Sequence, residues 1–336
     1  MRRTKLLRRT CKIWFTFICC SGLTFSSSRL ALAQVAEPET PQANYLSNVF
    51  GDLHYYTPKG AIEPSFTVSP TLHDEAISSQ DFGKAVYRSS TNASATITYG
   101  LVDRVWAYVN DSYLLHSETS STDAATNVTT TTDQRGASDP GFGIGWRVLD
   151  DPAAGIYGNL SLNGSPMVNR RKSATATQLG NNAKGDSTMG VSAGLFGVHS
   201  VHEYAVNLNL SHSTASSGTS DVPANSYVGI PTTSMNLNPR YRFHATERFY
   251  LQPGLYLYYP QLSATRSHNT SNYDRHTQPA YLQENFTVAF LLRPLLLVSS
   301  SINYQKNSSY ETFTGGKTRS TDSTRTAMDF TVATQL

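Results

Sequence analysis

About a dozen stretches in the last three-quarters of this 336-residue chain alternate between apolar and polar residues. Very short turns join them on one side, and long loops rich in serine, threonine and asparagine join them on the other. An alternation with a period of two places the apolar side chains of a strand on one face. Short turns at one end and long loops at the other are typical of a bacterial outer-membrane β-barrel. The sequence therefore predicts an all-β fold, a transmembrane antiparallel up-and-down β-barrel.

The alternation predicts 12 strands, each of about 9–12 residues, which is close to the length that a tilted strand needs to cross a bilayer. They cover residues 61–69, 91–100, 104–115, 142–148, 155–163, 188–197, 204–211, 235–243, 249–259, 281–291, 296–304 and 328–336. In the strand 204–211, for example, Tyr204, Val206 and Leu208 are expected to face lipid and their neighbours the lumen.

The connections set the expected topology. Tight turns at about residues 101–104, 149–153, 198–202, 244–248 and 292–295 alternate with long loops at about 70–90, 116–139, 164–187, 212–233, 260–279 and 307–325. An even number of strands leaves both termini on the short-turn side, which is periplasmic in such barrels. Pro239 and Pro253 fall inside predicted strands, where local bulges are expected to absorb the missing donors. The alternative fold is a soluble β-sandwich or β-solenoid, which does not need long loops at alternate connections.

The N-terminus predicts export. Residues 1–33 combine a basic start, a short apolar stretch and a small-residue exit, which indicates a signal peptide cleaved after Ala33. All three cysteines lie in this leader, so no disulfide is expected in the mature chain. The leader also carries seven of the 27 Lys and Arg residues and none of the 24 Asp and Glu residues, so the mature net charge is −4. This charge gives no support to nucleic-acid binding.

Two further segments follow the leader. Residues 34–59 are expected to form a periplasmic lead-in segment, in which residues 44–56 make either a short helical turn or a plug-like segment. Residues 60–336 are expected to form the barrel. The last strand ends in the sequence ATQL, and a terminal apolar residue suits recognition by the barrel-assembly machinery.

Three short runs resemble a known family. The runs YRSSTN at 87–92, YGLVDR at 99–104 and SDPGFGIGWRVL at 138–149 are similar to outer-membrane transporter-like barrels associated with meta-pathway phenol degradation. The similarity covers about residues 60–165. It implies an outer-membrane barrel that conducts hydrophobic or aromatic compounds, and it supplies no binding residues. Where the family pattern has a Gly-Asp pair, this chain has Asp139 followed by Pro140.

The predicted register also selects candidates for the lining of the lumen. The eight candidate selectivity residues are Arg147, Arg240, Arg242, Asp329, Tyr250, Gln252, Tyr256 and Tyr258. Inward charges tune the selectivity of a barrel, and aromatic faces beside arginine attract flat solutes by about 0.5–2 kcal/mol each. One interpretation is a constriction that admits small polar, anionic or aromatic solutes. The other is an internal polar network that fills a narrow barrel.

Catalysis and metal binding have little support. A hydrolase needs a serine beside a histidine, and the chain has no G-x-S-x-G motif. His212 and His268 near loop ends are interpreted as solvated histidines. His199, His202 and Glu203 could bind zinc, but they are interpreted as an exposed polar turn. We therefore predict a non-enzyme with no cofactor and no metal site.

Three functions stay open at this point. The first is a channel or transporter-like barrel for small hydrophobic, aromatic or anionic solutes. The second is a non-conducting surface barrel that acts through its long loops, such as residues 129–132, on a host or on lipopolysaccharide. The third is an outer-membrane hydrolase. The expected partners are outer-membrane lipid and lipopolysaccharide, the barrel-assembly machinery and an unidentified small solute, with no nucleic acid.

Overall fold

The computed structural model describes most of the chain from residue 53 onward. The described residues are 53–79, 83–168, 171–172, 179–183, 185–214, 216–219, 227–229, 231–260, 264–267, 275–277, 280–293, 296–308, 310–314 and 317–335. The predicted signal peptide (1–33) and most of the predicted lead-in segment lie outside them. No helix among the described residues is both long and apolar enough to cross a membrane.

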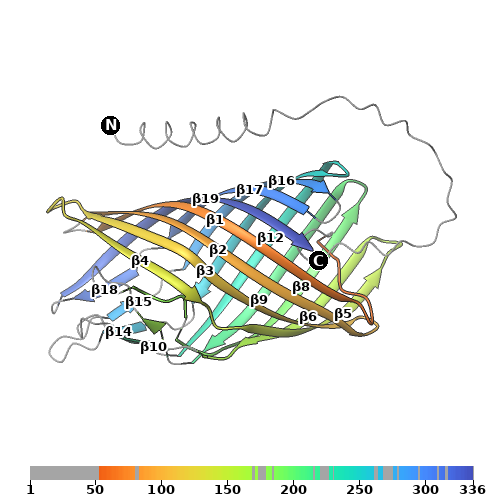
Figure 1. Ribbon diagram of the computed structural model, residues 1–336, viewed down its shortest axis with the longest axis horizontal. Coiled ribbons are helices and arrows are strands. Elements are labelled where there is room, and N and C mark those ends of the chain that lie inside the picture. Colours follow the sequence, from red (N-terminus) through yellow and green to blue (C-terminus); the bar gives the residue numbers. More distant parts are fainter. Residues whose placement is uncertain are drawn as a thin grey trace. The chain divides into compact units, whose positions relative to one another are not determined.

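Twelve long strands form a closed antiparallel barrel (Figure 1). They are β1 (Ile62–Ser79), β2 (Gly83–Val102), β3 (Val105–Asp123), β5 (Gly141–Asp151), β6 (Ile156–Ser165), β8 (Thr188–His199), β9 (His202–Ser213), β12 (Thr232–Thr246), β13 (Phe249–Pro260), β16 (Tyr281–Arg293), β17 (Leu296–Asn307) and β19 (Lys317–Gln335). Each pairs with the next, and β19 pairs back onto β1 from Ser65↔Gln335 to Ser79↔Thr321. The predicted number of strands and their antiparallel closure are confirmed.

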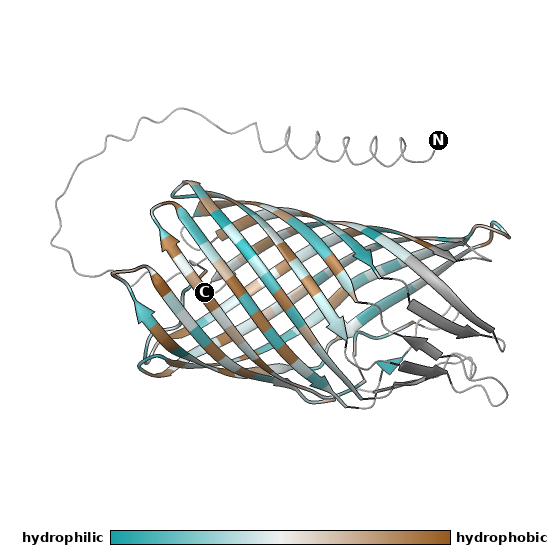
Figure 2. Ribbon diagram, turned by 180° about the vertical axis from the view of Figure 1, so that it is seen from behind, coloured by the Kyte–Doolittle hydropathy of each residue, from teal (hydrophilic) through white to brown (hydrophobic). Residues whose placement is uncertain are grey.

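The alternation of side chains gives the barrel two different surfaces. In β9, Tyr204 and Val206 are 51% and 45% exposed, whereas Glu203 and Ala205, which alternate with them, are almost completely buried. Figure 2 shows the same alternation of hydrophobic and hydrophilic residues along the strands of the barrel. A closed barrel satisfies every backbone hydrogen bond between strands, and an apolar outer face can then meet lipid. The fold is therefore that of a transmembrane barrel.

The short turns all lie at one end of the barrel, which we call the short-turn end. Residues 103–104 join β2 to β3, and residues 200–201 join β8 to β9. Arg104 and Ser200 in these turns have positive φ angles of 67° and 55°. Such left-handed residues are typical of tight hairpins. The predicted tight turns at these two places are confirmed.

Three of the predicted long loops are wrong. The regions 70–90, 116–139 and 307–325 are mostly strand. In the first two, β1 and β2 pair as far as Ser78↔Gly83, and β3 pairs with β4 (Thr129–Ala137) as far as Thr122↔Thr129. In the third, β18 (Tyr310–Thr314) pairs with the start of β19. The serine and threonine residues of these regions favour an extended backbone. The regions lack the apolar alternation of a lipid-facing strand, so the strands predicted from that alternation end too early. The hairpins thus continue beyond the predicted spans.

Several short strands lie at the end of the barrel opposite the short turns, which we call the long-loop end. These are β7 (Arg171–Lys172), β10 (Ser216–Thr219), β11 (Tyr227–Gly229), β14 (Ala264–Ser267), β15 (Arg275–Thr277) and β18 (Tyr310–Thr314). At the tip of the β3–β4 hairpin, Asp123 accepts hydrogen bonds from the backbone N–H groups of Ala125 and Thr126 at 2.8 and 2.9 Å. These two hydrogen bonds lower the pKa of Asp123.

The expected bulges at the two prolines are absent. Between β12 and β13 the pairing Leu237↔Leu257 continues as Arg240↔Gly254, so the register does not shift around Pro239. Pro253 also keeps its regular partner, Phe286, on β16. Both prolines instead occupy regular positions on the outer face of their strands.

The interior of the barrel is packed near the short-turn end. Ala289, Leu297 and Ala333 form a buried cluster, against which Tyr250 and Leu291 pack. Further buried side chains of the same end are Trp106, Phe196 and Ala205, each within a few residues of a short turn. This packed layer surrounds the site described next.

Candidate functional site

Residues 53–59, which we call the inner segment, enter the barrel at its short-turn end. Lys59 pairs with Gly100 of β2, and the backbone N–H of Leu53 donates to the carboxylate of Glu203 on β9 at 2.9 Å. Because both partners belong to the barrel wall and lie near short turns, the inner segment crosses the short-turn mouth from one side toward the other.

Glycine 100 lets the inner segment lie against the wall. The backbone N–H of Gly60 donates to Gly100 O at 2.8 Å, and the N–H of Gly100 donates to Ala61 O at 3.0 Å. A Cβ on Gly100 would overlap the carbonyl oxygen of Pro58. Only glycine therefore permits this close approach between two backbones.

This contact leads to a first prediction. The substitution Gly100→Ala should dislodge the inner segment, because the new methyl overlaps backbone atoms and overpacking costs about 1–3 kcal/mol. The measurement is the rate of tryptic cleavage after Lys59, which should rise in the folded protein. The control is Gly197→Ala, whose Cβ would meet its nearest neighbours only at 3.8 Å. Equal cleavage rates in the two variants would contradict the prediction.

Glutamate 63 holds the middle of the inner segment. Its side chain lies at the start of β1 and is buried. One carboxylate oxygen accepts a hydrogen bond from Thr57 Oγ1 at 2.7 Å, and the other accepts one from the hydroxyl of Tyr55. Because charge-assisted hydrogen bonds are about twice as strong as neutral ones, this bidentate contact fixes residues 55–57 against β1.

Arginine 147 holds the segment from the other side. Its guanidinium donates a hydrogen bond to the carbonyl oxygen of His54 and lies 4.7 Å from the ring centroid of Tyr56 and 5.1 Å from that of Tyr157. The His54 ring also stacks on Tyr157 at 4.3 Å, and Tyr56 lies 5.7 Å from Trp106. Aromatic and cation–π contacts from β3, β5 and β6 thus surround the inner segment.

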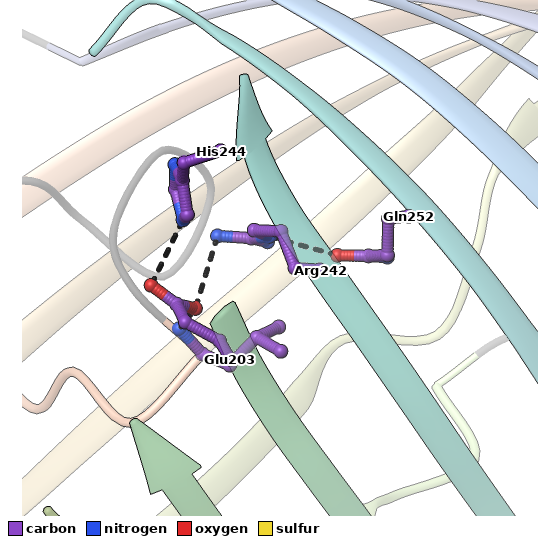
Figure 3. A network of polar contacts seen from close by, with 5 residues as sticks. Glu203, Arg242, His244 and Gln252 are labelled. Atoms are coloured by element: carbon purple, nitrogen blue, oxygen red, sulfur yellow. Dashed lines mark hydrogen bonds and ion pairs between the residues drawn. The ribbon is translucent and has the colours of Figure 1, made fainter. Parts of the chain in front are cut away.

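Glutamate 203 anchors the first residue of the segment, Leu53. Figure 3 shows the polar network around this carboxylate, with Arg242, His244 and Gln252. Besides the N–H of Leu53, the Glu203 carboxylate contacts His244 Nε2 at 3.0 Å and forms an ion pair with Arg242 Nη1 at 3.7 Å. Arg242 in turn donates from Nε to Gln252 Oε1 at 3.0 Å. The side chains of Glu203 and Arg242 are only 4% and 8% exposed. Breaking a buried pair of this kind costs about 3–5 kcal/mol, because it leaves one charge uncompensated.

We expect His54 to make the docking of the inner segment sensitive to pH. Burial lowers the pKa of His54, and the nearby Arg147 lowers it further, whereas the carboxylates of Glu203 and Asp150 act in the opposite direction. A histidine with a lowered pKa favours its neutral form in the docked state. Its contribution to docking is therefore complete above its ordinary pKa of about 6.5 and is lost as the pH falls below that value.

A second prediction follows from the lowered pKa of His54. Acidification from about pH 7.5 to pH 5 should release the inner segment, because the proton on His54 must be accommodated in a buried site beside Arg147. The measurement is tryptic cleavage after Lys59 as a function of pH, corrected for the pH dependence of trypsin on an unfolded peptide of residues 50–65. The variant His54→Gln should show a flatter profile. A wild-type profile no steeper than that of His54→Gln would contradict it.

The structure divides the eight candidate residues between two levels of the lumen. Arg147, Arg242, Tyr250 and Gln252 belong to the site around the inner segment, where Arg242 also lies 4.2 Å from the ring centroid of Tyr250. Arg240, Tyr256, Tyr258 and Asp329 lie farther along their strands from the short turns. Buried Arg240 Nε has no hydrogen-bond partner among the described residues.

Several residues of the site escaped the sequence analysis. Glu203 was interpreted as part of an exposed polar turn, and this is wrong, because it is 3% exposed and faces the lumen. The available signal was the strand register itself, since Glu203 lies opposite Arg242 in the β9–β12 pairing. The other missed residues are Glu63, His244, Trp106, Tyr157 and the inner segment's Tyr56.

The histidines considered for zinc or catalysis lie elsewhere. His199 and His202 pair across the β8–β9 turn, and His202 Nδ1 lies 2.7 Å from the Tyr241 hydroxyl. His212 Nδ1 contacts Thr233 Oγ1 at 3.0 Å rather than a serine, and His268 lies outside the described residues. In the described part of the chain, no three metal-ligating side chains gather at one point.

The comparisons with known proteins support the fold. No family model matches the chain, and neither does any curated protein. An outer membrane channel from Pseudomonas putida F1 is 10% identical with a TM-score of 0.51, and the match covers 84% of this chain and 98% of that one. A FadL homologue from Pseudomonas aeruginosa (9% identity, TM-score 0.39, 82% and 90% covered) and the protease OmpT from Escherichia coli (8%, 0.33, 84% and 98%) are less similar. The first likeness shows an outer-membrane β-barrel fold and nothing finer.

Proposed function

We propose that this protein is an outer-membrane channel or transporter-like barrel for small solutes, and that its inner segment closes the periplasmic mouth. The observation that carries the proposal is a closed barrel whose short-turn mouth is crossed by a segment held only by non-covalent side-chain and backbone contacts. Both chain ends of the barrel lie at the short-turn end, which faces the periplasm in barrels of this type.

The lining of the lumen supports passage of polar solutes. Amide and hydroxyl side chains of neighbouring strands form rows of hydrogen bonds across the wall. In one such row, Asn163 Nδ2 donates to Ser192 Oγ at 3.1 Å, and Ser192 Oγ donates to Asn209 Oδ1 at 2.8 Å. Asn159 Oδ1 and Asn238 Oδ1 are buried and have no hydrogen-bond partner in the described part of the chain. Water or a solute normally satisfies such groups.

A hollow at the long-loop end supports an entrance for solutes at that end of the barrel. This hollow of about 600 Å³ is lined by Lys84 and Val86 of β2, by Thr119, Ser121 and Asp123 of β3, and by Thr126, Val128, Thr130 and Thr132. Cavities of about 300–1,000 Å³ accommodate drug-sized molecules. A solute that enters there meets polar side chains along its path and then the closed end.

The expected class of solute follows from the inward-facing charges that do not hold the inner segment. Arg147 and Arg242 hold the inner segment and its anchor, so the free inward positive charge near the closed end is centred on Arg240. This arrangement favours small polar or anionic solutes, and an aromatic ring can also stack on the tyrosines of β13. A purely hydrophobic solute would leave the polar lining unsatisfied.

The test combines a folding assay with a transport assay. Unboiled protein should migrate differently from boiled protein on a denaturing gel, and it should fractionate with the outer membrane. In liposomes, uptake of small solutes should be slow for the wild type and faster when the inner segment is removed. A protein that stays in the soluble periplasmic fraction, or that conducts nothing in either form, would overturn the proposal.

A further inference from the structure

Three tyrosines form an aromatic surface inside the barrel. The ring of Tyr281 on β16 lies 4.9 Å from that of Tyr258 and 5.8 Å from that of Tyr256, both on β13, with interplanar angles of 23°. The intervening Leu255 and Leu257 are each 41% exposed on the outer face, so the tyrosines face the lumen.

A polar cavity adjoins this aromatic surface. It measures about 90 Å³ and is lined by Gln283, Asn303, Gln305, Arg325, Ala327 and Asp329. The strand register places it beside the tyrosines, because Tyr256 pairs with Gln283, Gln283 with Gln305, and Gln305 with Arg325. One row across four strands therefore runs from an aromatic ring through two amides to a guanidinium.

The cavity offers donors and acceptors in close alternation. Gln283 Nε2 donates to Asn303 Oδ1 at 3.3 Å, and Asn303 Nδ2 donates to the carboxylate of Asp329. Arg325 adds guanidinium donors on the same face of β19, where it lies opposite Glu75 of β1. A hydroxyl group both donates and accepts, so a set of neighbouring hydroxyls matches this lining better than any single charge does.

From this juxtaposition we propose that the tyrosine surface and the adjoining cavity form a binding site for a neutral, polyhydroxylated ring solute of the carbohydrate class. The three tyrosine rings stack on one another, so the apolar C–H face of such a solute ring would extend this stack while its hydroxyl edge enters the cavity. A volume of about 90 Å³ has room for the hydroxyls of one ring edge. The inference deepens the proposed channel function and rests on it for access to the lumen.

Other solute classes match the site less well. An anion would meet the carboxylate of Asp329, and a cation would meet the guanidinium of Arg325. A plain aromatic ring would stack on the tyrosines but would displace water from the amides without replacing its hydrogen bonds. Only a neutral ring that carries several hydroxyls uses both halves of the site.

The test measures binding of maltose to the full-length protein in detergent by titration calorimetry, with benzoate as the comparison ligand. We expect saturable binding of maltose with a Kd on the order of 1 mM and weaker binding of benzoate. The variant Tyr258→Leu should weaken maltose binding about tenfold, since it removes one stacking face. The matched control is Tyr259→Leu on the outer face of the same strand, which should bind as the wild type does.

The outcomes separate this site from the channel function. Binding of maltose without any solute flux would support the site and overturn the channel proposal. Flux without maltose binding, or benzoate binding stronger than maltose binding, would overturn the site and leave the channel proposal standing. Equal losses in Tyr258→Leu and Tyr259→Leu, with both proteins still heat-modifiable, would also overturn it.

Discussion

Substituting Glu203→Ala should open the barrel. The change removes the acceptor of the Leu53 N–H and leaves Arg242 buried without its carboxylate partner. The lost hydrogen bond to Leu53 is what distinguishes the docked from the released state, and a hydrogen bond to a charged group contributes about 1.5–3 kcal/mol. The ratio of docked to released inner segment should therefore fall by roughly one to two orders of magnitude. In planar bilayers, this variant should therefore spend a much larger fraction of time in the conducting state than the wild type.

Two comparisons make the result specific. Glu247→Ala removes an exposed carboxylate from the β12–β13 turn at the same end of the barrel and should leave the current unchanged. Glu203→Gln keeps an acceptor for the Leu53 N–H but loses the charge opposite Arg242, so it should give an intermediate effect. If Glu203→Ala folds into a heat-modifiable barrel with the current of the wild type, Glu203 does not control closure.

Removal of the inner segment should have the largest effect. Deleting residues 53–59 eliminates at once the Lys59 bridge to Gly100 and the contacts with Glu63, Arg147 and Glu203, while β1 begins only at Ile62. We expect a conductance at least about tenfold higher than that of the wild type, because the short-turn mouth loses the backbone that crosses it. Single-channel recording and the uptake of small solutes by liposomes both measure this.

The deletion also tests how Glu203 acts. Since Glu203 is proposed to work by holding the inner segment, Glu203→Ala should add nothing in a protein that already lacks residues 53–59. Replacing the seven residues by an equal length of glycine and serine is the control for chain length, and this protein should conduct like the deletion. Additive effects of the two changes would mean that Glu203 shapes the pore directly rather than through the segment.

The strands of the barrel wall were largely predictable from the local sequence pattern, whereas the contacts inside the barrel were less predictable. The alternation around Tyr204 and Val206 correctly predicted which face of β9 meets the outside, because this property depends only on neighbouring residues. The same logic put Arg240, Arg242 and Tyr256 on the lumen face. It failed at residues 70–90, 116–139 and 307–325, where strands continue without apolar alternation. Pairing there depends on backbone hydrogen bonds that composition does not reveal.

The sequence by itself determined the strand number, the antiparallel order and the two faces of the wall, since a period of two and the placement of turns are local properties. Only the tertiary structure decided that the inner segment lies in the short-turn mouth. The contact between Leu53 and Glu203 joins residues 150 positions apart. Glu203 becomes an anchor only because barrel closure buries it beside Arg242 and His244, where an unpaired carboxylate would be unfavourable.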